Sequence, residues 1–209
     1  MQPIQAVSHR YAAPKLPFIK EALDKLIQSN QLVRVNEPTC WISNMVVRER
    51  PASATKPAKV RICLDPSQTV NKAIMRPVYP MPTLEENIHR FNQGKIFSVF
   101  YIKDAFQTIA LTHESSLLTT MNTPWGCYCW TRLPFGVSSA PEEFQRHLRD
   151  ALCGLDSVVN IADDVLVVGK GESLADATRV HDNTVINLRN RLSQHKLNPD
   201  KLNPDKIKF

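Results

Sequence analysis

The clearest chemical signal in the sequence is a pair of adjacent carboxylates, Asp163 and Asp164. They lie between two apolar runs rich in β-branched residues, Val158–Ile161 and Val165–Val168, which predicts a hairpin with the acids at its tip. Hard divalent ions such as Mg²⁺ prefer carboxylate oxygens, and phosphoryl transfer can use two ions about 4 Å apart. The hairpin alone leaves two interpretations open, a metal site and an exposed acidic turn.

A second motif runs from Leu133 to Gln145 and joins a turn to a helix. Its first part contains Pro134 and Gly136, and the residues Ser139–Glu142 have the composition of a helix start. Taken by itself, the motif is also consistent with an ordinary entry from a loop into a helix.

The N-terminal residues predict an amphipathic helix followed by short strands. Apolar side chains recur at helical spacing over 17–29, and alternating or β-branched runs follow it. The proline-rich stretch 50–57 reads as a loop between strands. The predicted strands lie near 31–35, 43–48 and 59–64.

The middle of the chain begins with a proline-rich connector over 77–82, which is the candidate boundary between two lobes. Thr83 then opens a helix with a capping box, and Ile88 and Phe91 are its expected buried face. The nearly continuous apolar run 96–102 suits a strand covered on both faces.

Two strands and two helices are among the remaining predicted elements. Strands are expected near 117–122 and 127–132, and the helix that starts at residue 139 buries one apolar face. The residues expected inward are Phe144, Leu148 and Leu152 in this helix, and Leu174, Ala177, Val185, Leu188 and Leu192 in a long helix over 172–195. The order predicts an α+β protein with helices on one face of an antiparallel sheet.

Composition narrows the class of protein. With 43% hydrophobic and 22% charged residues, the sequence is typical of a folded globular protein and not of a disordered one. No apolar run approaches the roughly 20 residues that span a bilayer, and the first residues lack the plan of a signal peptide. We therefore expect a cytoplasmic or nuclear protein that does not bind membranes.

Charge is distributed unevenly along the chain. Residues 1–80 carry 12 Lys and Arg against 5 Asp and Glu, a balance of +7. Residues 81–170 carry 7 against 10, a balance of −3. A basic lobe beside an acidic centre is suited to a protein that holds a polyanion and binds divalent metal.

The two motifs, in this order and spacing, resemble the reverse transcriptases of long-terminal-repeat retrotransposons and retroviruses. The resemblance begins near Phe18 and runs to Phe209. Further matching stretches are Trp41–Val47, Arg61–Pro66, Tyr79–Leu84, Asp104–Gln107 and Leu197–Lys201.

The resemblance implies roles for individual residues. Asp163 and Asp164 match the pair that binds the two catalytic Mg²⁺ or Mn²⁺ ions. Arg61 matches the fingers arginine that contacts the incoming nucleotide, a role to which a guanidinium is suited. Either Lys56 or Lys59 matches the fingers lysine near the triphosphate.

Further roles carry over to the nucleotide pocket. Phe106 matches the aromatic residue that would clash with a ribose 2′-hydroxyl. Phe135 and Gly136 match the loop that lines the nucleotide and template pocket. Either Lys201 or Lys206 matches the lysine of the family's Asn-Pro-Asp-Lys segment, because the chain repeats that segment.

The sequence departs from the family's pattern at the first catalytic aspartate, where this chain has Tyr101. A phenol with a pKa of about 10 is a poor replacement for a carboxylate on Mg²⁺ at neutral pH. Asp104 is a candidate stand-in, although the family often has serine at that position. The tyrosine usual two residues before the aspartate pair is Ile161 here.

These observations predict a right-hand polymerase with fingers and palm only. Residues 1–80 would form the first part of the fingers, and 81–209 the palm with an intervening fingers segment at about 104–140. We expect the thumb, connection and ribonuclease H regions to be absent. The expected partners are template-primer, deoxynucleoside triphosphates and other domains of a retroelement polyprotein.

Two functions from different classes remain open at this point. The first is a truncated RNA-directed DNA polymerase that is catalytically impaired at Tyr101 or rescued there by Asp104. The second is a non-enzymatic nucleic-acid-binding remnant of a retroelement.

Overall fold

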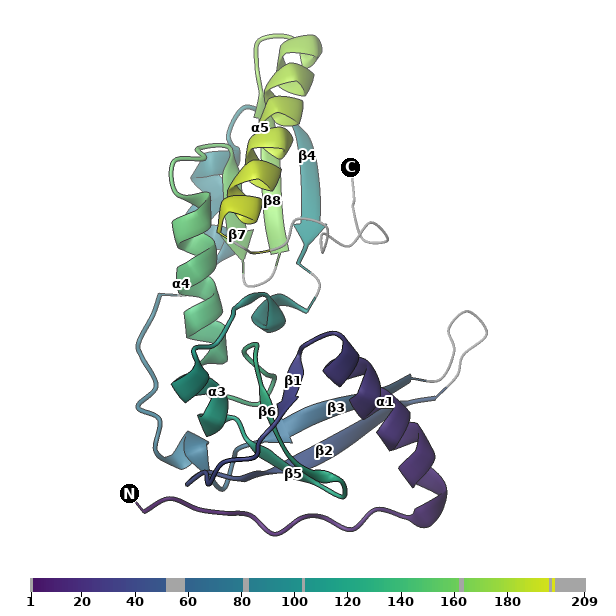
Figure 1. Ribbon diagram of the computed structural model, residues 1–209. Helices are drawn as coiled ribbons and strands as arrows, with labels where there is room; N and C mark the ends of the chain where they lie inside the picture. Colours follow the sequence, from purple (N-terminus) through teal and green to yellow (C-terminus); the bar gives the residue numbers. More distant parts are fainter. Residues whose placement is uncertain are drawn as a thin grey trace. The chain divides into compact units, whose positions relative to one another are not determined.

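The protein divides into two compact units, each built from two separate stretches of chain (Figure 1). Unit 1 comprises Met1–Arg76 and Ala110–Ala140, and unit 2 comprises Pro77–Ile109 and Pro141–Phe209. Each unit has a hydrophobic core of its own. The computed structural model describes residues 2–51, 59–80, 83–102, 104–161, 164–195 and 197.

Unit 1 is a five-stranded sheet with strand order β1-β6-β5-β2-β3. Neighbouring strands are antiparallel except β2 and β5, which are parallel. Its elements are α1 (Leu16–Gln28), β1 (Leu32–Arg34), β2 (Ser43–Arg50), β3 (Lys59–Asp65), η2 (Val70–Lys72), α3 (His113–Leu118), β5 (Met121–Thr123) and β6 (Gly126–Trp130), preceded by the 3-10 turn η1 (Ala13–Lys15).

The core of unit 1 forms between α1 and the sheet. Ile19 and Leu23 of α1 are buried, as the helical spacing predicted, and they pack with alternate strand residues such as Met45 and Ile62. The predicted helix and the first three predicted strands are confirmed. The strand predicted near 117–122 begins later than expected, at Met121. Residues 117 and 118 belong instead to the short helix α3, which Thr112 caps.

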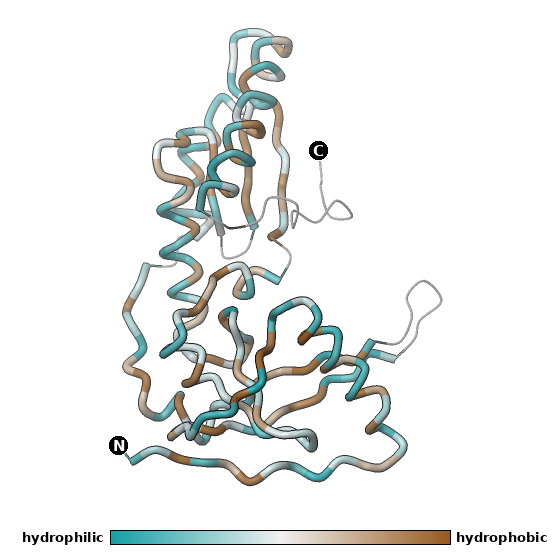
Figure 2. Tube along the Cα trace, in the orientation of Figure 1, coloured by the Kyte–Doolittle hydropathy of each residue, from teal (hydrophilic) through white to brown (hydrophobic). Residues whose placement is uncertain are grey.

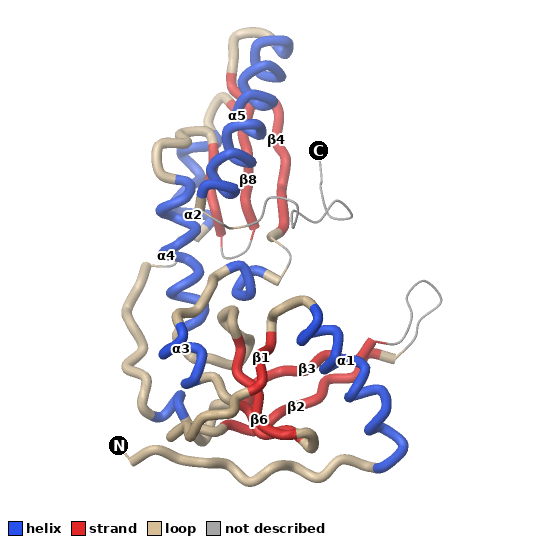
Figure 3. The backbone as a smooth tube through the Cα atoms, viewed as in Figure 1, coloured by secondary structure: helices blue, strands red, loops and turns tan. Residues whose placement is uncertain are grey.

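Unit 2 is a three-stranded antiparallel sheet with strand order β4-β8-β7. The expected antiparallel sheet with helices on one face is confirmed (Figure 3). Its elements are α2 (Leu84–Asn87), η3 (Ile88–Phe91), β4 (Gly94–Tyr101), η4 (Ala105–Thr108), α4 (Ala140–Leu152), β7 (Val158–Ile161), β8 (Asp164–Lys170) and α5 (Leu174–Gln194).

One face of this sheet and the two long helices form the core of unit 2. Alternate residues of the strands, among them Phe100, Val165 and Val167, are buried against Leu148 of α4 and Leu188 of α5. The strands are accordingly the most hydrophobic part of the unit (Figure 2). The predicted inward residues of α4 are all buried.

Three expected burials in unit 2 were wrong. Ile88 is 62% exposed, because the helix that Thr83 caps ends after four residues and continues as a 3-10 turn. Leu174 is 65% exposed as the first residue of α5, directly after its N-cap. Phe97 is 40% exposed, because it lies on the sheet face opposite to Ser98 and Phe100.

Helix α5 lies unusually close to the sheet at Gly169. A Cβ atom at this position would stand 2.4 Å from the carbonyl oxygen of Ala177. Nearby, the buried His181 joins α5 to β4 through a 2.8 Å hydrogen bond between its Nε2 and Ser98 Oγ. No helix among the described residues has the length and apolar character needed to cross a membrane.

Substitutions of a buried and an exposed residue of α5 test which face of this helix lies in the core. Leu188→Ala removes a fully buried side chain and should lower the free energy of unfolding by about 2–5 kcal/mol. The control Ile186→Ala, on the same helix but 57% exposed, should change it by no more than about 0.5 kcal/mol. Urea unfolding followed by circular dichroism measures both, and equal losses would contradict the assignment of the core face.

Candidate active site

The acidic hairpin of unit 2 is directly paired with the strand that carries Tyr101. Strands β7 and β8 form the predicted hairpin, and β4 pairs with β8 on its other side. In this register Tyr101 is opposite Asp164, and Ile161 is opposite Asp164 from the other strand. The prediction that β4 and the hairpin share one antiparallel sheet is confirmed, whereas Asp163 lies outside the described residues.

The register follows from the apolar residues beside these positions. Phe100 is opposite Val165, and both side chains are buried against the helices. Because side chains alternate along a strand, Tyr101 and Asp164 point to the other face. Residues directly opposite in an antiparallel pair have Cβ atoms about 4.5–5.5 Å apart, so the side chains of Tyr101 and Asp164 start from neighbouring positions on this face.

Among the described residues this position supplies one carboxylate, that of Asp164. The position that faces Asp164 on β4 supplies the phenol of Tyr101 and no second carboxylate. Mg²⁺ is bound by carboxylate oxygens, phosphate oxygens and water. Within the described ranges no three His, Cys, Asp or Glu side chains gather in a group that could hold a metal ion.

Asp104, three residues after Tyr101, has an unusual backbone conformation. Its φ of 51° lies in the left-handed region, which is uncommon for a residue other than glycine. Its carbonyl oxygen accepts a 2.9 Å hydrogen bond from the amide of Gln107 and so starts the 3-10 turn η4. The backbone of Asp104 therefore has a structural role at the start of η4.

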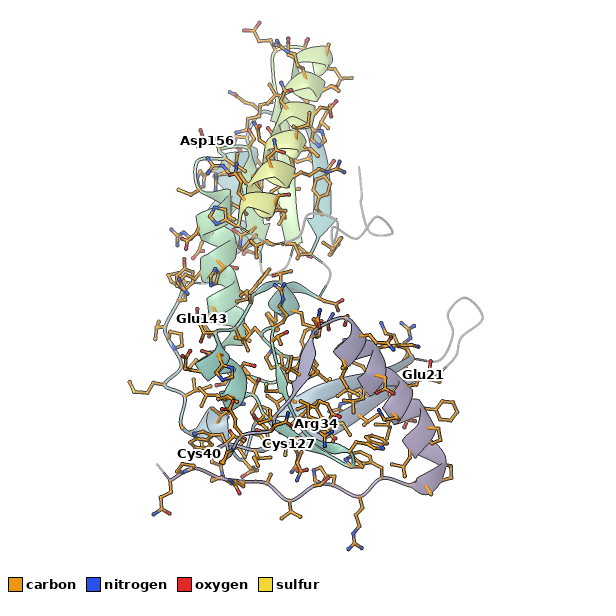
Figure 4. The ribbon with its side chains drawn as sticks, viewed as in Figure 1. Glu21, Arg34, Cys40, Cys127, Glu143 and Asp156 are labelled. Atoms are coloured by element: carbon orange, nitrogen blue, oxygen red, sulfur yellow. The ribbon has the colours of Figure 1, made fainter. Side chains whose placement is uncertain are left out.

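Turn η4 carries Phe106, the residue matched to the family's ribose-sensing aromatic. Its ring meets the ring of Phe144 edge to face, with centroids 6.0 Å apart and an angle of 70°. Phe144 belongs to the buried face of α4, whose outer side carries the ion pair of Glu143 with Arg146 (Figure 4). The core of unit 2 therefore fixes the position of Phe106.

In unit 1, the residues matched to nucleotide binding are brought together by β3 and the loop after β6. Arg61 is exposed on β3, and its guanidinium carbon lies 5.7 Å from the centroid of the Phe135 ring. A guanidinium over an aromatic face is a favourable cation–π geometry. Lys59 is exposed two residues before Arg61, while Lys56, Lys201 and Lys206 lie outside the described residues.

Gly136, in the loop after β6, lies very close to the backbone of β3. Its φ of 111° is accessible to glycine, and a Cβ atom there would lie 2.4 Å from the carbonyl oxygen of Leu64. The side-chain amide of Asn71 forms two hydrogen bonds with the backbone of the same loop. Its Nδ2 donates to the carbonyl oxygen of Gly136 at 2.8 Å, and its Oδ1 accepts from the amide of Ser138 at 2.9 Å.

The sequence contained no signal for the role of Asn71. It is separated from the loop by more than 60 residues, and neither periodicity nor a local motif relates the two. The contact exists only in the folded unit, where the residues after Asp65 lie against the loop that contains Phe135.

Residues 23–209 match the family described as reverse transcriptase (RNA-dependent DNA polymerase). The chain belongs to the reverse transcriptase family. A match of this length extends through both units and confirms the resemblance found in the sequence.

Relatives of this reverse transcriptase domain are retroelement polyproteins. The chain is 27% identical to the retrovirus-related Pol polyprotein from transposon 412 of Drosophila melanogaster over 82% of its length. It is 33% identical to the enzymatic polyprotein of figwort mosaic virus over 74% of its length. It spans only 14% and 22% of these two relatives, respectively.

Solved reverse transcriptases share the fold. The prototype foamy virus protease-reverse transcriptase, as a CSH mutant, matches 93% of this chain with a TM-score of 0.73 at 19% identity. The foamy viral enzyme in complex with an RNA/DNA hybrid matches 91% with a TM-score of 0.71 at 17% identity. This chain covers 24% of each of those chains.

The two hydrogen bonds of the Asn71 side chain predict that its removal loosens the loop that contains Gly136 and Ser138. Asn71→Ala should speed amide exchange at Ser138 by roughly 2- to 10-fold, because a hydrogen bond of this kind contributes about 0.5–1.5 kcal/mol. The control Lys72→Ala removes a neighbouring side chain, whose ammonium donates to Oε1 of Gln68, and should leave exchange at Ser138 unchanged. Hydrogen exchange followed by NMR measures the rate at the Ser138 amide. Equal rates in the two variants would contradict the role of Asn71.

Proposed function

We propose that this reverse transcriptase domain binds template-primer but carries out deoxynucleotidyl transfer poorly. The observation that carries the proposal is the register of β4 and β8, which sets the Tyr101 phenol opposite the Asp164 carboxylate. In an intact relative, the resemblance implies two Mg²⁺ or Mn²⁺ ions between carboxylates at these positions, supporting attack of the primer 3′-hydroxyl on the nucleotide's α-phosphate.

The residues of the two units have separate roles in this proposal. In unit 1, Arg61 binds the triphosphate, with Lys59 or Lys56 beside it, and the loop of Phe135 and Gly136 lines the base pocket. In unit 2, Phe106 excludes ribonucleotides, and Asp163 and Asp164 are the metal ligands. We assign unit 1 to the fingers and unit 2 to the palm.

Nucleic acid is the partner that the comparisons support best. The foamy viral relatives were solved in complex with double-stranded DNA and with an RNA/DNA hybrid. In this chain, the +7 balance of residues 1–80 provides a sequence-independent attraction for phosphates. Within an element's replication cycle, such a domain would act in the cytoplasm or the nucleus, together with other domains of a polyprotein.

The weak point of the proposed site is transition-state stabilisation. Replacing a metal-binding carboxylate by a phenol removes charge where it is needed, and the ring adds bulk at the same place. A loss of several kcal/mol slows a reaction on the order of 10³-fold. Nucleic-acid binding draws on the basic residues of unit 1 and should persist, so the second candidate function is that of a non-catalytic nucleic-acid-binding domain.

Binding to template-primer should depend steeply on salt. Each phosphate neutralised by a basic side chain releases counterions, so the logarithm of the association constant should fall by about 0.9 per contact for each unit of log salt. Fluorescence anisotropy with a labelled duplex measures this slope, and an uncharged-backbone duplex of the same sequence is the control. An affinity that is equal at low and moderate salt would argue against phosphate-mediated binding.

Primer extension tests the role of Tyr101. On a homopolymer template with Mg²⁺ or Mn²⁺, the unaltered chain should show little or no extension, and Tyr101→Asp should raise the rate on the order of 10³-fold. Tyr101→Asn removes the ring without adding a carboxylate and should remain inactive. This control separates the effect of charge from the effect of bulk.

Two results would contradict the proposed impairment. Equal extension by Tyr101→Asp and Tyr101→Asn would show that the carboxylate is irrelevant. Extension by the unaltered chain near about 1 per second, abolished by Asp104→Asn, would show that the site uses Asp104 instead.

A further inference from the structure

Arg61 is exposed on β3, and the strand alone does not fix the position of its guanidinium group. The residue directly opposite on β2 is Arg48, and like charges in this position repel each other. Among the described residues, no carboxylate forms an ion pair with Arg61. An arginine with several free rotamers loses conformational entropy when it binds an anion, so a group that orders it beforehand strengthens the binding.

The ring of Phe135 gives this guanidinium a defined place. The guanidinium carbon of Arg61 lies 5.7 Å from the ring centroid, within the roughly 6 Å over which a ring face attracts a cation. The attraction comes from the quadrupole of the ring and not from a hydrogen-bond acceptor. This contact therefore leaves the N–H donors of Arg61 available to phosphate oxygens, whereas a carboxylate partner would occupy some of them.

The residues on both sides of Phe135 are fixed to the body of unit 1. Leu133 is buried, and Val137 packs against the core of this unit. Between them, Gly136 brings the main chain so close to the carbonyl oxygen of Leu64 that a Cβ atom would not fit. The main chain that carries the ring therefore has little freedom to move away from β3.

The side chain of Asn71 completes the connection between this loop and β3. It donates to the carbonyl oxygen of Gly136 at 2.8 Å and accepts from the amide of Ser138 at 2.9 Å. The main-chain amide of Asn71 donates to the carbonyl oxygen of Pro66 at 3.1 Å, directly after the end of β3. The strand that carries Arg61 is thus followed, a few residues later, by the side chain that holds the loop.

We propose that Phe135 and Asn71 are positioning residues for Arg61, so that the triphosphate of the nucleotide meets a guanidinium that is already in place. The inference rests on the proposed function, in which Arg61 binds the triphosphate, and it adds how that residue is prepared. Phe135 acts by direct contact with the cation, and Asn71 acts through the backbone of the loop. Preorganisation of this kind lowers the entropic cost of binding.

The mobility of the Arg61 guanidinium tests the positioning without any nucleotide. In NMR relaxation measurements of arginine Nε–H groups, Phe135→Leu and Asn71→Ala should each lower the order parameter of Arg61. Phe18→Leu, which changes an exposed ring of α1 in the same way, and Lys72→Ala, next to Asn71, should leave it unchanged. An order parameter that does not respond to Phe135→Leu or to Asn71→Ala would overturn the role of that residue.

Binding of a deoxynucleoside triphosphate tests the consequence for recognition. The chain is first bound to a template-primer whose primer end is blocked against extension, and a fluorescently labelled complementary nucleotide is then titrated. Phe135→Leu should weaken nucleotide binding roughly 3- to 10-fold, from the usual strength of a cation–π contact. Asn71→Ala should weaken it roughly 2- to 10-fold, as the loss of its hydrogen bonds predicts. Phe135→Tyr keeps the ring and should bind as the unaltered chain does.

A double-mutant cycle separates the positioning of Arg61 from a role of Phe135 in lining the base pocket. Arg61→Gln removes the cation, so Phe135→Leu should have almost no further effect on triphosphate affinity in that background. A trifluorinated phenylalanine at position 135 keeps the size of the ring but weakens the attraction of its face for a cation, so it should also lower the affinity. Both results follow from contact with the cation, and neither follows from packing alone.

The outcomes distinguish this inference from the function on which it rests. If the losses from Phe135→Leu and Arg61→Gln add in full, or if fluorination has no effect, the inference is overturned and the role of Arg61 in nucleotide binding stands. If Arg61→Gln does not change triphosphate affinity, or if the unaltered chain binds no deoxynucleotide, the proposed role of Arg61 fails and the inference fails with it. A loss at Phe135 that disappears without Arg61, together with increased mobility of the guanidinium, supports the inference.

Discussion

The pairing of β4 with β8 is the constraint on which the proposed chemistry depends. A shift of this pairing by one residue would turn Phe100 and Val165 out of the core and exchange the face on which Tyr101 and Asp164 lie. The helices α4 and α5 cover only one face, so the hydrophobic core selects the register. The position of Asp164 opposite Tyr101 is therefore decided by apolar residues outside the proposed site.

The same principle applies in unit 1, where backbone packing positions the polar residues. The loop with Phe135 can approach β3 because Gly136 has no side chain, and Asn71 holds it there through two hydrogen bonds. Arg61 is held on β3, with its guanidinium over the Phe135 ring of the same loop. In each unit, the residues with proposed roles are thus positioned by packing within that unit.

Much of the fold could be predicted from the sequence, because its longer segments have clear periodicity. The hairpin around Asp164 and the buried face of α4 were predicted from local pattern alone. Burial at element ends could not be predicted: Ile88 and Leu174 have the right spacing but lie where the helical geometry stops or starts. The facing of Tyr101 and Asp164, and the contact of Asn71 with its loop, are products of strand pairing between distant segments.

The strand order of unit 1 also determines when its sheet can close during synthesis. The hairpin of β5 and β6 lies between β1 and β2, so it separates two strands that are made much earlier. Until this hairpin leaves the ribosome, β1 has no strand to pair with, and α1 can cover only β2 and β3. The sheet of unit 1 is thus completed last at its centre, after β4 of the other unit has already been made. A nascent chain of this kind must keep apolar strand edges unpaired for the time needed to add several tens of residues, which is the period when a chaperone would be of most use to it.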